Sequence, residues 1–256
     1  MSSDRSGGRF WLPLVGPLVL VAVWAAFSWL RLFPESLFPT PWAVGTGLVT
    51  ELASLRLVNN AIASLFRVSL GFLLAVVLGV PAGLVLGRSA RARAALLPIV
   101  NFFRSLSPLA WIPFAILWLG IGDPPAIFLI FMAAFFPVVL STTAAVASIP
   151  SVYFRVARDL GIERAALLRD VTLPAIAPQV ITTLRVTAGL SWLVVVAAEM
   201  IAGHDGLGFA VWDARNGLRT DLLVAAMVVI GLIGVALDRL LVRLTYIPSV
   251  RWGYER

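Results

Sequence analysis

Six stretches of this chain are apolar over about 20 residues each, the length that an α-helix needs to cross the hydrocarbon core of a bilayer. They lie at 12–30, 61–86, 96–119, 125–149, 174–201 and 222–244. Only 13% of the residues are charged, whereas a soluble domain is roughly 25% charged. The sequence therefore predicts an all-α integral membrane protein with six transmembrane helices.

The arginines predict how these helices are oriented. All 20 basic residues are arginine, and the net charge is +7. With the N-terminus in the cytoplasm, 13 arginines fall in cytoplasmic segments, four in outer segments and three within spans. Basic residues favour the cytoplasmic side of a membrane. We therefore expect a multi-pass protein of the bacterial inner (plasma) membrane with both termini in the cytoplasm, and no nucleic acid as partner.

Missing residue types exclude several chemistries. The chain has no cysteine, so disulfides and thiolate-bound metals are excluded. It has no lysine, which excludes a phosphate-loop ATPase site and Schiff-base chemistry. The one histidine, His204, stands beside Asp205, and this pair makes neither a metal site nor a catalytic triad. We expect no metal, no cofactor and no enzymatic activity of its own.

Two spans carry special patterns. The third span is interrupted at Arg104-Ser105-Leu106-Ser107-Pro108, and broken backbone at membrane depth is tolerated only beside protein or a water-filled cavity. The second span has a small residue at every fourth position, which allows close approach of another helix. This stripe consists of Gly71, Ala75, Gly79, Gly83 and Gly87. Prolines at 34, 39 and 41 precede a further expected helix, 42–57, at the outer interface.

The segment 150–174 is the longest charged stretch, with seven charges between the fourth and fifth spans. Apolar residues still recur in it at helical spacing, and Gly161 should divide it into two short helices. The arginine count places it in the cytoplasm. An amphipathic helix there docks on a partner protein or rests on the lipid of the inner leaflet, and the residues alone leave both interpretations open.

This segment resembles the EAA loop of the permeases of binding-protein-dependent ABC importers. Arg155-Val156-Ala157 occupies the Glu-Ala-Ala positions, Gly161 the glycine, and Leu173-Pro174 the closing pair. Arg155 departs from the usual glutamate. The resemblance implies the type I importer fold, with a coupling helix on which two cytoplasmic ATPases dock and supply the ATP. The docking residues would be Arg155, Val156, Ala157, Arg158, Asp159, Leu160, Gly161, Ile162 and Arg164.

Residues 61–244 resemble more narrowly the nitrate, sulfonate, taurine and bicarbonate branch of these permeases. The resembling segments are 107–113, 120–123, 189–192, 197–200 and Gly206-Leu207-Gly208-Phe209. The branch implies import of a small anionic solute, an external solute-binding protein, and a second permease copy or a paralogue as partner. Residues 1–60 and 245–256 would flank this core. Bicarbonate or a pyrimidine precursor are alternative solutes, and a secondary transporter or an intramembrane enzyme are alternative classes.

Charged and polar residues inside the spans are candidates for the solute path, because charge is costly there and guanidinium groups suit oxyanions. The candidates are Arg104, Ser107, Thr183, Arg185 and Glu199. The alternative for both arginines is that they reach the headgroups or pair structurally. For Glu199, pairing with an arginine of the outer loop is the alternative to a gating role.

Overall fold

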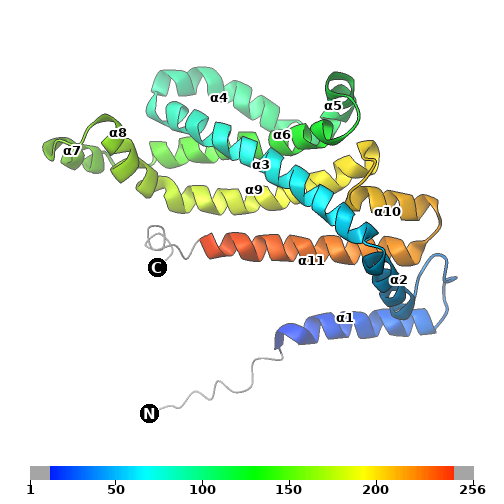
Figure 1. Ribbon diagram of the computed structural model, residues 1–256. Helices are drawn as coiled ribbons and strands as arrows, with labels where there is room; N and C mark the ends of the chain where they lie inside the picture. The colour runs from blue at the N-terminus through cyan, green and yellow to red at the C-terminus, as the bar shows by residue number, and fades with distance from the viewer. Residues whose placement is uncertain (1–11, 245–256) are drawn as a thin grey trace, which may run out of the picture. The chain divides into compact units, whose positions relative to one another are not determined.

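The computed structural model describes residues 12–244, and every regular element in that range is helical (Figure 1). The helices before the charged loop are α1 (Leu12–Trp29), α2 (Pro41–Ala53), α3 (Arg56–Arg88), α4 (Ala90–Ser105), η1 (Pro108–Trp111), α5 (Ile112–Leu119) and α6 (Asp123–Ala147). Those from the loop onward are α7 (Ser151–Asp159), α8 (Arg164–Ala166), the π-helix η2 (Leu167–Thr172), α9 (Leu173–Ala202), α10 (Leu207–Asn216) and α11 (Thr220–Leu244). The predicted all-α class is confirmed; the predicted terminal segments 1–11 and 245–256 lie outside the described residues.

Four of the described helices are long and apolar enough to cross a membrane. They are α3, α6, α11 and the continuous run Leu167–Ala202. The α4 helix and the segment Pro108–Leu119 pass the same test together, with a bend of 86° between them. The first predicted span, α1, is apolar, but its described residues are too few to count as a crossing. Five of the six predicted spans thus have helices of the required length, if the bent pair counts as one.

The chain divides into two compact units. The first holds the residues up to Val58 together with Ala210–Val229, and the second holds Asn59–Phe209 and the residues from Ile230 onward. In the first unit, α2 begins at Thr40, whose hydroxyl accepts a hydrogen bond from the Ala43 amide at 3.1 Å. This N-cap sets the start of the helix predicted at 42–57. The second unit contains all of the predicted site residues.

The second unit is built on α6 and α9, which lie side by side (Figure 1). Ala145, Val146, Ile176 and Val180 form a buried cluster toward the loop end of this pair. Ile112, Ala115, Ala126, Leu129 and Ala198 form a second buried cluster toward the opposite end. The charged loop 150–174 connects one end of α6 to one end of α9, so the start of α6 and the end of α9 meet at the far end.

The small-residue stripe of α3 lies against α6. A Cβ atom on Gly71 would lie 2.8 Å from the Ile127 carbonyl oxygen, and one on Gly83 would lie 2.5 Å from the Thr142 Cβ. Gly79 and Gly87 face Val138 and Val146 in the same way, and Ala75 is fully buried. The two helices are therefore close enough that a larger residue at these positions would collide with α6.

Candidate functional site

The loop 150–174 begins with α7, which Gly161 ends. The Ile162 amide donates to the Ala157 carbonyl at 2.8 Å, and the Gly161 amide donates to the Arg158 carbonyl at 3.0 Å. These two bonds form a Schellman motif, which requires a left-handed residue after the helix. Gly161 has φ +70° and provides it without steric cost. The structure divides the segment at Gly161 as predicted, but only the first part is a separate short helix, because the second part continues through η2 into α9.

The α7 helix presents three different faces. Ala157 is only 2% exposed and faces the interior of the chain, so it is not available to a partner. Val152, Val156 and Leu160 recur every four residues and are exposed, Leu160 by 71%. Arg155, Arg158 and Asp159 are also exposed and occupy a third face. Ile162 is partly buried, and the Arg164 side chain lies outside what the structure describes.

The end of the loop is tied to the spans through Thr172. Its buried hydroxyl donates to the Leu167 carbonyl at 3.1 Å and accepts a hydrogen bond from Arg88 at 3.3 Å. The π-helix turns of η2 join the short α8 helix to the long α9 helix without a break. Such turns occur frequently at functional positions. The loop is thus linked to the last residue of α3 and directly to α9.

Arg104 lies at the interruption of the third span. It occupies the last turn of α4, and the chain bends directly after it, as predicted. The neighbouring Phe103 stacks on Phe136 with ring centroids 5.6 Å apart, and Phe136 lies midway along α6. The Arg104 side chain is exposed and makes no hydrogen bond or ion pair with any residue in 12–244. Ser107 is exposed beside it, and its hydroxyl does not cap η1.

Arg185, in contrast, is paired. Its Nε and Nη2 donate to the two carboxylate oxygens of Asp238 in α11 at 2.7 and 3.0 Å. Both side chains are about half exposed, at 42% and 52%. The hydroxyl of Thr183 shares a short hydrogen bond with Ser141 of α6. Both residues therefore make structural contacts between spans, which was the alternative interpretation for Arg185.

Glu199 is buried and bonds to Arg67 of α3 rather than to an arginine of the outer loop, which corrects the expected partner. Arg67 is 1% exposed, and its Nη1 donates to Glu199 at 2.8 Å. Its Nε donates to Asp123 at 2.6 Å, and its Nη2 forms a short contact with Asp205. We call Arg67, Glu199, Asp123 and Asp205 the Arg67 cluster. Glu199 is therefore enclosed by its partners in this structure.

The cluster is built on one face of α3. Ser64 donates to the Glu199 carboxylate at 2.8 Å, and the Asn60 side chain accepts from the Gly206 amide at 3.0 Å. Asn60, Ser64 and Arg67 follow helical spacing, and the small-residue stripe continues the same face. The Gly208 amide also donates to Glu199, at 2.9 Å. The buried carboxylate is thereby fully hydrogen-bonded.

Sequence reasoning assigned no role to Arg67, Asp123, Ser64 and Asp238. Arg67 stood within a span, and its spacing from Asn60 and Ser64 was the signal that these polar residues share a face. The three carboxylates come from positions 123, 199 and 205, so no local pattern joined them. In each case the partner lies on a different helix or turn.

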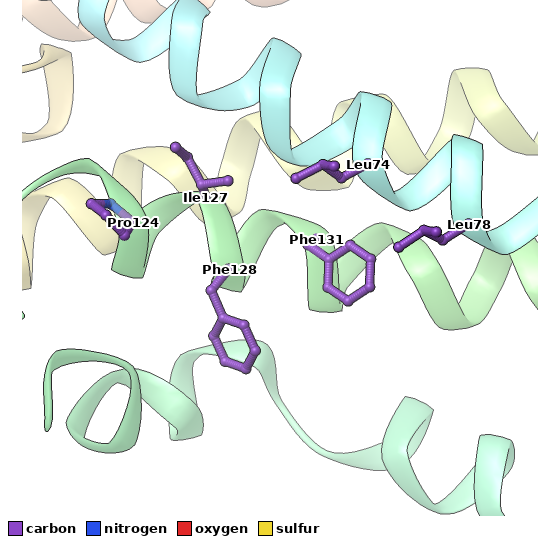
Figure 2. A pocket seen from close by; sticks show the side chains of 6 residues that line it. All are labelled: Leu74, Leu78, Pro124, Ile127, Phe128 and Phe131. Carbon is purple, nitrogen blue, oxygen red and sulfur yellow. The ribbon is translucent and has the colours of Figure 1, made fainter. Parts of the chain in front are cut away.

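An apolar groove between α3 and α6 is unsuited to an anion. It is lined by Leu74 and Leu78 of α3 and by residues of α6, as Figure 2 shows. The α6 residues are Pro124, Ile127, Phe128 and Phe131. None of these side chains offers a charge or a hydrogen-bond donor. A charged solute in this groove would lose its hydrating water and gain no hydrogen bond in exchange. We therefore do not assign the solute path to this groove.

Comparison with known proteins assigns the chain to a family. The family model described as "Binding-protein-dependent transport system inner membrane component" matches residues 75–247. The taurine transport system permease protein TauC of Escherichia coli is 38% identical over 225 residues, which cover 86% of this chain and 82% of TauC. The bicarbonate transport system permease protein CmpB of Synechococcus elongatus is 36% identical over 242 residues, covering 89% and 85%. The nitrate import permease protein NrtB of Synechocystis is 40% identical over 177 residues, covering 69% and 64%.

Solved structures show the same fold. A structure of the MetNI methionine ABC transporter has a TM-score of 0.59 and 24% identity, covering 76% of this chain and 99% of that one. A bacterial alginate ABC transporter in complex with an alginate-bound periplasmic protein has a TM-score of 0.64 and 15% identity, covering 93% and 97%. The chain therefore belongs to the family of inner-membrane components of binding-protein-dependent transport systems, and it is a permease subunit of an ABC importer.

Proposed function

We propose that this permease forms the membrane path of an importer for a small oxyanion. The relatives are named for taurine, nitrate and bicarbonate, each of which carries an oxyanion group. The observation that carries the proposal is Arg104, an exposed arginine next to the broken backbone of the third span. An arginine at membrane depth without a protein partner is costly unless water or a solute reaches it.

The surroundings of Arg104 suit a planar anion. Its guanidinium presents parallel N–H donors that match two oxygens of one oxyanion. The exposed Ser107 hydroxyl lies beyond the bend and offers one further donor. Arg185 is not given this role, because Asp238 already occupies its Nε and Nη2. The proposed path therefore runs along the bend between α4 and η1.

Uptake measurements test this path. Arg104→Gln in the complete importer should lower the maximal uptake of taurine, nitrate or bicarbonate, whichever is transported, at least tenfold, roughly the effect of losing one charge-assisted contact. Arg104→Lys should restore part of the uptake, because it keeps the charge but loses the paired donors. Arg215→Gln, at an exposed arginine of α10, is the matched control. Unchanged uptake by a correctly assembled Arg104→Gln importer would remove Arg104 from the path.

We further propose that ATPase subunits dock on α7. Family membership implies separate ATPase partners, and the exposed row Val152, Val156 and Leu160 has the spacing of a helix that binds in an apolar groove. The exposed Arg155, Arg158 and Asp159 would surround this row as a polar rim, which fixes register and rate more than affinity. Gly161 ends this helix, and Thr172 ties the end of the loop to α3.

A pair of variants separates docking from lipid contact. Leu160→Asp should abolish co-purification of the ATPase, because a charge in an apolar interface is left without a partner. Arg155→Gln, on the charged face, should retain it. If α7 rests on lipid, both variants should keep the ATPase bound, and that outcome would contradict the docking proposal. Co-purification of an ATPase also separates an importer subunit from a secondary transporter.

The orientation of the chain in the membrane and the composition of the importer are also proposals. We place the loop 150–174 and both termini in the cytoplasm, two copies of the chain in each importer, and an external solute-binding protein on the opposite side. The arginine distribution supports the orientation. Because the chain has no cysteine, single substitutions such as His204→Cys and Leu160→Cys report sidedness directly. An impermeant thiol reagent added to intact cells should label the first and spare the second.

A further inference from the structure

The Arg67 cluster combines one buried acid with two accessible ones. Glu199 is enclosed with Arg67, whereas the side chains of Asp123 and Asp205 are each 45% exposed. Glu199 belongs to α9, but both aspartates sit at turns, one at the start of α6 and one before α10. The three acids on one arginine therefore differ in how freely each can leave it.

The Glu199 side of the cluster is fixed. Ser64 and the Gly208 amide hold its carboxylate, and the Leu207 amide donates to Ser64 at 2.9 Å. A Cβ atom on Gly206 would overlap the Glu199 carboxylate, and one on Gly208 would overlap the Val196 carbonyl. Separating Arg67 from Glu199 would leave two buried charges unpaired, which costs several kcal/mol.

The Asp123 side is releasable, whereas Asp205 belongs to the fixed turn, because its carbonyl accepts a hydrogen bond from Arg67 and the following amide donates to Asn60. Asp123 follows Gly120 and Gly122, both with positive φ, and Asp205 precedes Gly206, which has φ +101°. When Asp123 leaves Arg67, water can hydrate the half-exposed carboxylate, and the main loss is the hydrogen bond of the buried Arg67 Nε–H. Arg67 stays neutralised by Glu199 in the process. The contact with Asp123 is therefore easier to break than the contact with Glu199, which gives two discrete arrangements, clasped and released.

We infer that the Arg67 cluster is a clasp that holds the α5–α6 turn and the α9–α10 turn against α3, and that it releases the α5–α6 turn during the transport cycle. Asp123 begins α6 and directly follows α5, which continues the bent third span. Release of Asp123 thus changes the connection between the bent third span and α6. Arg67 acts here as a positioning residue. The clasp rests on the importer role but not on the proposed oxyanion path.

Distances between spin labels test the release. Ile62 on α3 and Ile121 on the α5–α6 turn are both exposed, and substitution of both with cysteine gives a labelled pair in a chain without other thiols. Double electron–electron resonance on the complete importer should show one distance in the resting state. A longer distance should appear with MgATP and vanadate. An unchanged distance in both states would overturn the clasp.

Loss of the Asp123 carboxylate should favour the released state. Asp123→Asn should increase the longer distance without nucleotide and raise ATP hydrolysis in the absence of binding protein about fivefold or more, a typical coupling effect. Asp213→Asn, at an exposed carboxylate of α10 outside the cluster, should change neither. A resting distance and basal hydrolysis equal to those of the unchanged importer would refute the inference. If the Asp123→Asn variant fails to assemble, the nucleotide dependence in the labelled importer still decides. Arg104→Gln should leave these distances unaffected. An uptake result that contradicts the oxyanion proposal would therefore not contradict the clasp.

Discussion

Arg67 donates a hydrogen bond of 2.8 Å to Glu199, although 132 positions separate the two residues in the chain. Both side chains are buried, one on α3 and the other near the end of α9. A buried ion pair is sustained only where further hydrogen bonds satisfy both groups. Here Ser64, the Gly208 amide and two aspartates supply them. The pair therefore ties together the end of the helix bundle that lies away from the loop 150–174.

Breaking this pair should destabilise the permease strongly. Arg67→Met alone leaves the buried Glu199 carboxylate without its cation, and Glu199→Leu alone leaves buried Arg67 with only the two half-exposed aspartates; the expected cost is about 3–5 kcal/mol for the first and less for the second. The double variant removes both charges and should be clearly more stable than either single one. Thermal unfolding in detergent measures all three. Equal and small shifts in melting temperature for both single variants would contradict the assigned burial.

The α3 stripe makes a second prediction about stability. Gly83→Ala places a methyl group 2.5 Å from the Thr142 Cβ, and overpacking of this kind costs about 1–3 kcal/mol. Gly231→Ala is the matched control, because nothing lies within 4 Å of its added methyl group, and it should be neutral or stabilising. The comparison uses melting temperature and the yield of assembled importer. A Gly83→Ala protein as stable as the control would place α3 farther from α6.

The local features of this fold were predictable from the sequence, and the reasons are physical. A helix must supply a full hydrocarbon thickness of apolar residues, so most spans were visible, as was the break after Arg104. Small residues at every fourth position give a single face, whatever helix packs against it. Gly161 breaks a helix through its own backbone freedom, and this needs no tertiary contact.

The pairing of distant groups was not predictable. Glu199 was expected to meet an arginine of the outer loop, and only the path of α3 brings Arg67 to it instead. Asp238 on Arg185 is a similar case, since the two lie on different helices. The pattern of α7 identified its apolar residues, but it did not divide them between the chain interior, where Ala157 lies, and the exposed row with Leu160. Whether an apolar residue of α7 is buried or exposed depends on which neighbouring helix covers its face.

The Arg185–Asp238 pair should behave as one unit. Arg185→Gln and Asp238→Asn each remove the same two hydrogen bonds, so we expect the double variant to be no worse than the worse single one. Solute concentration at half-maximal uptake should stay the same in all three, because Arg185 is not assigned to the path. Uptake kinetics and assembly yield provide the double-mutant cycle. A raised half-maximal concentration in Arg185→Gln, with normal uptake in Asp238→Asn, would return Arg185 to the path.

Substitution of Gly161 should weaken the turn after α7 because of the backbone conformation at this position, and not because of collisions with neighbouring atoms. Nothing lies within 4 Å of a Cβ atom added there, so an alanine meets no steric obstacle, but it would have to adopt φ +70°. A left-handed conformation costs an alanine about 1–2 kcal/mol, and asparagine tolerates it better. Gly161→Ala should therefore loosen the end of α7 and weaken ATPase co-purification, with Gly161→Asn in between and the melting temperature of the spans little changed. Hydrogen exchange of the Gly161 and Ile162 amides reports the loosening directly. If alanine and asparagine retain the ATPase equally well, the Schellman turn does not set the position of the docking helix.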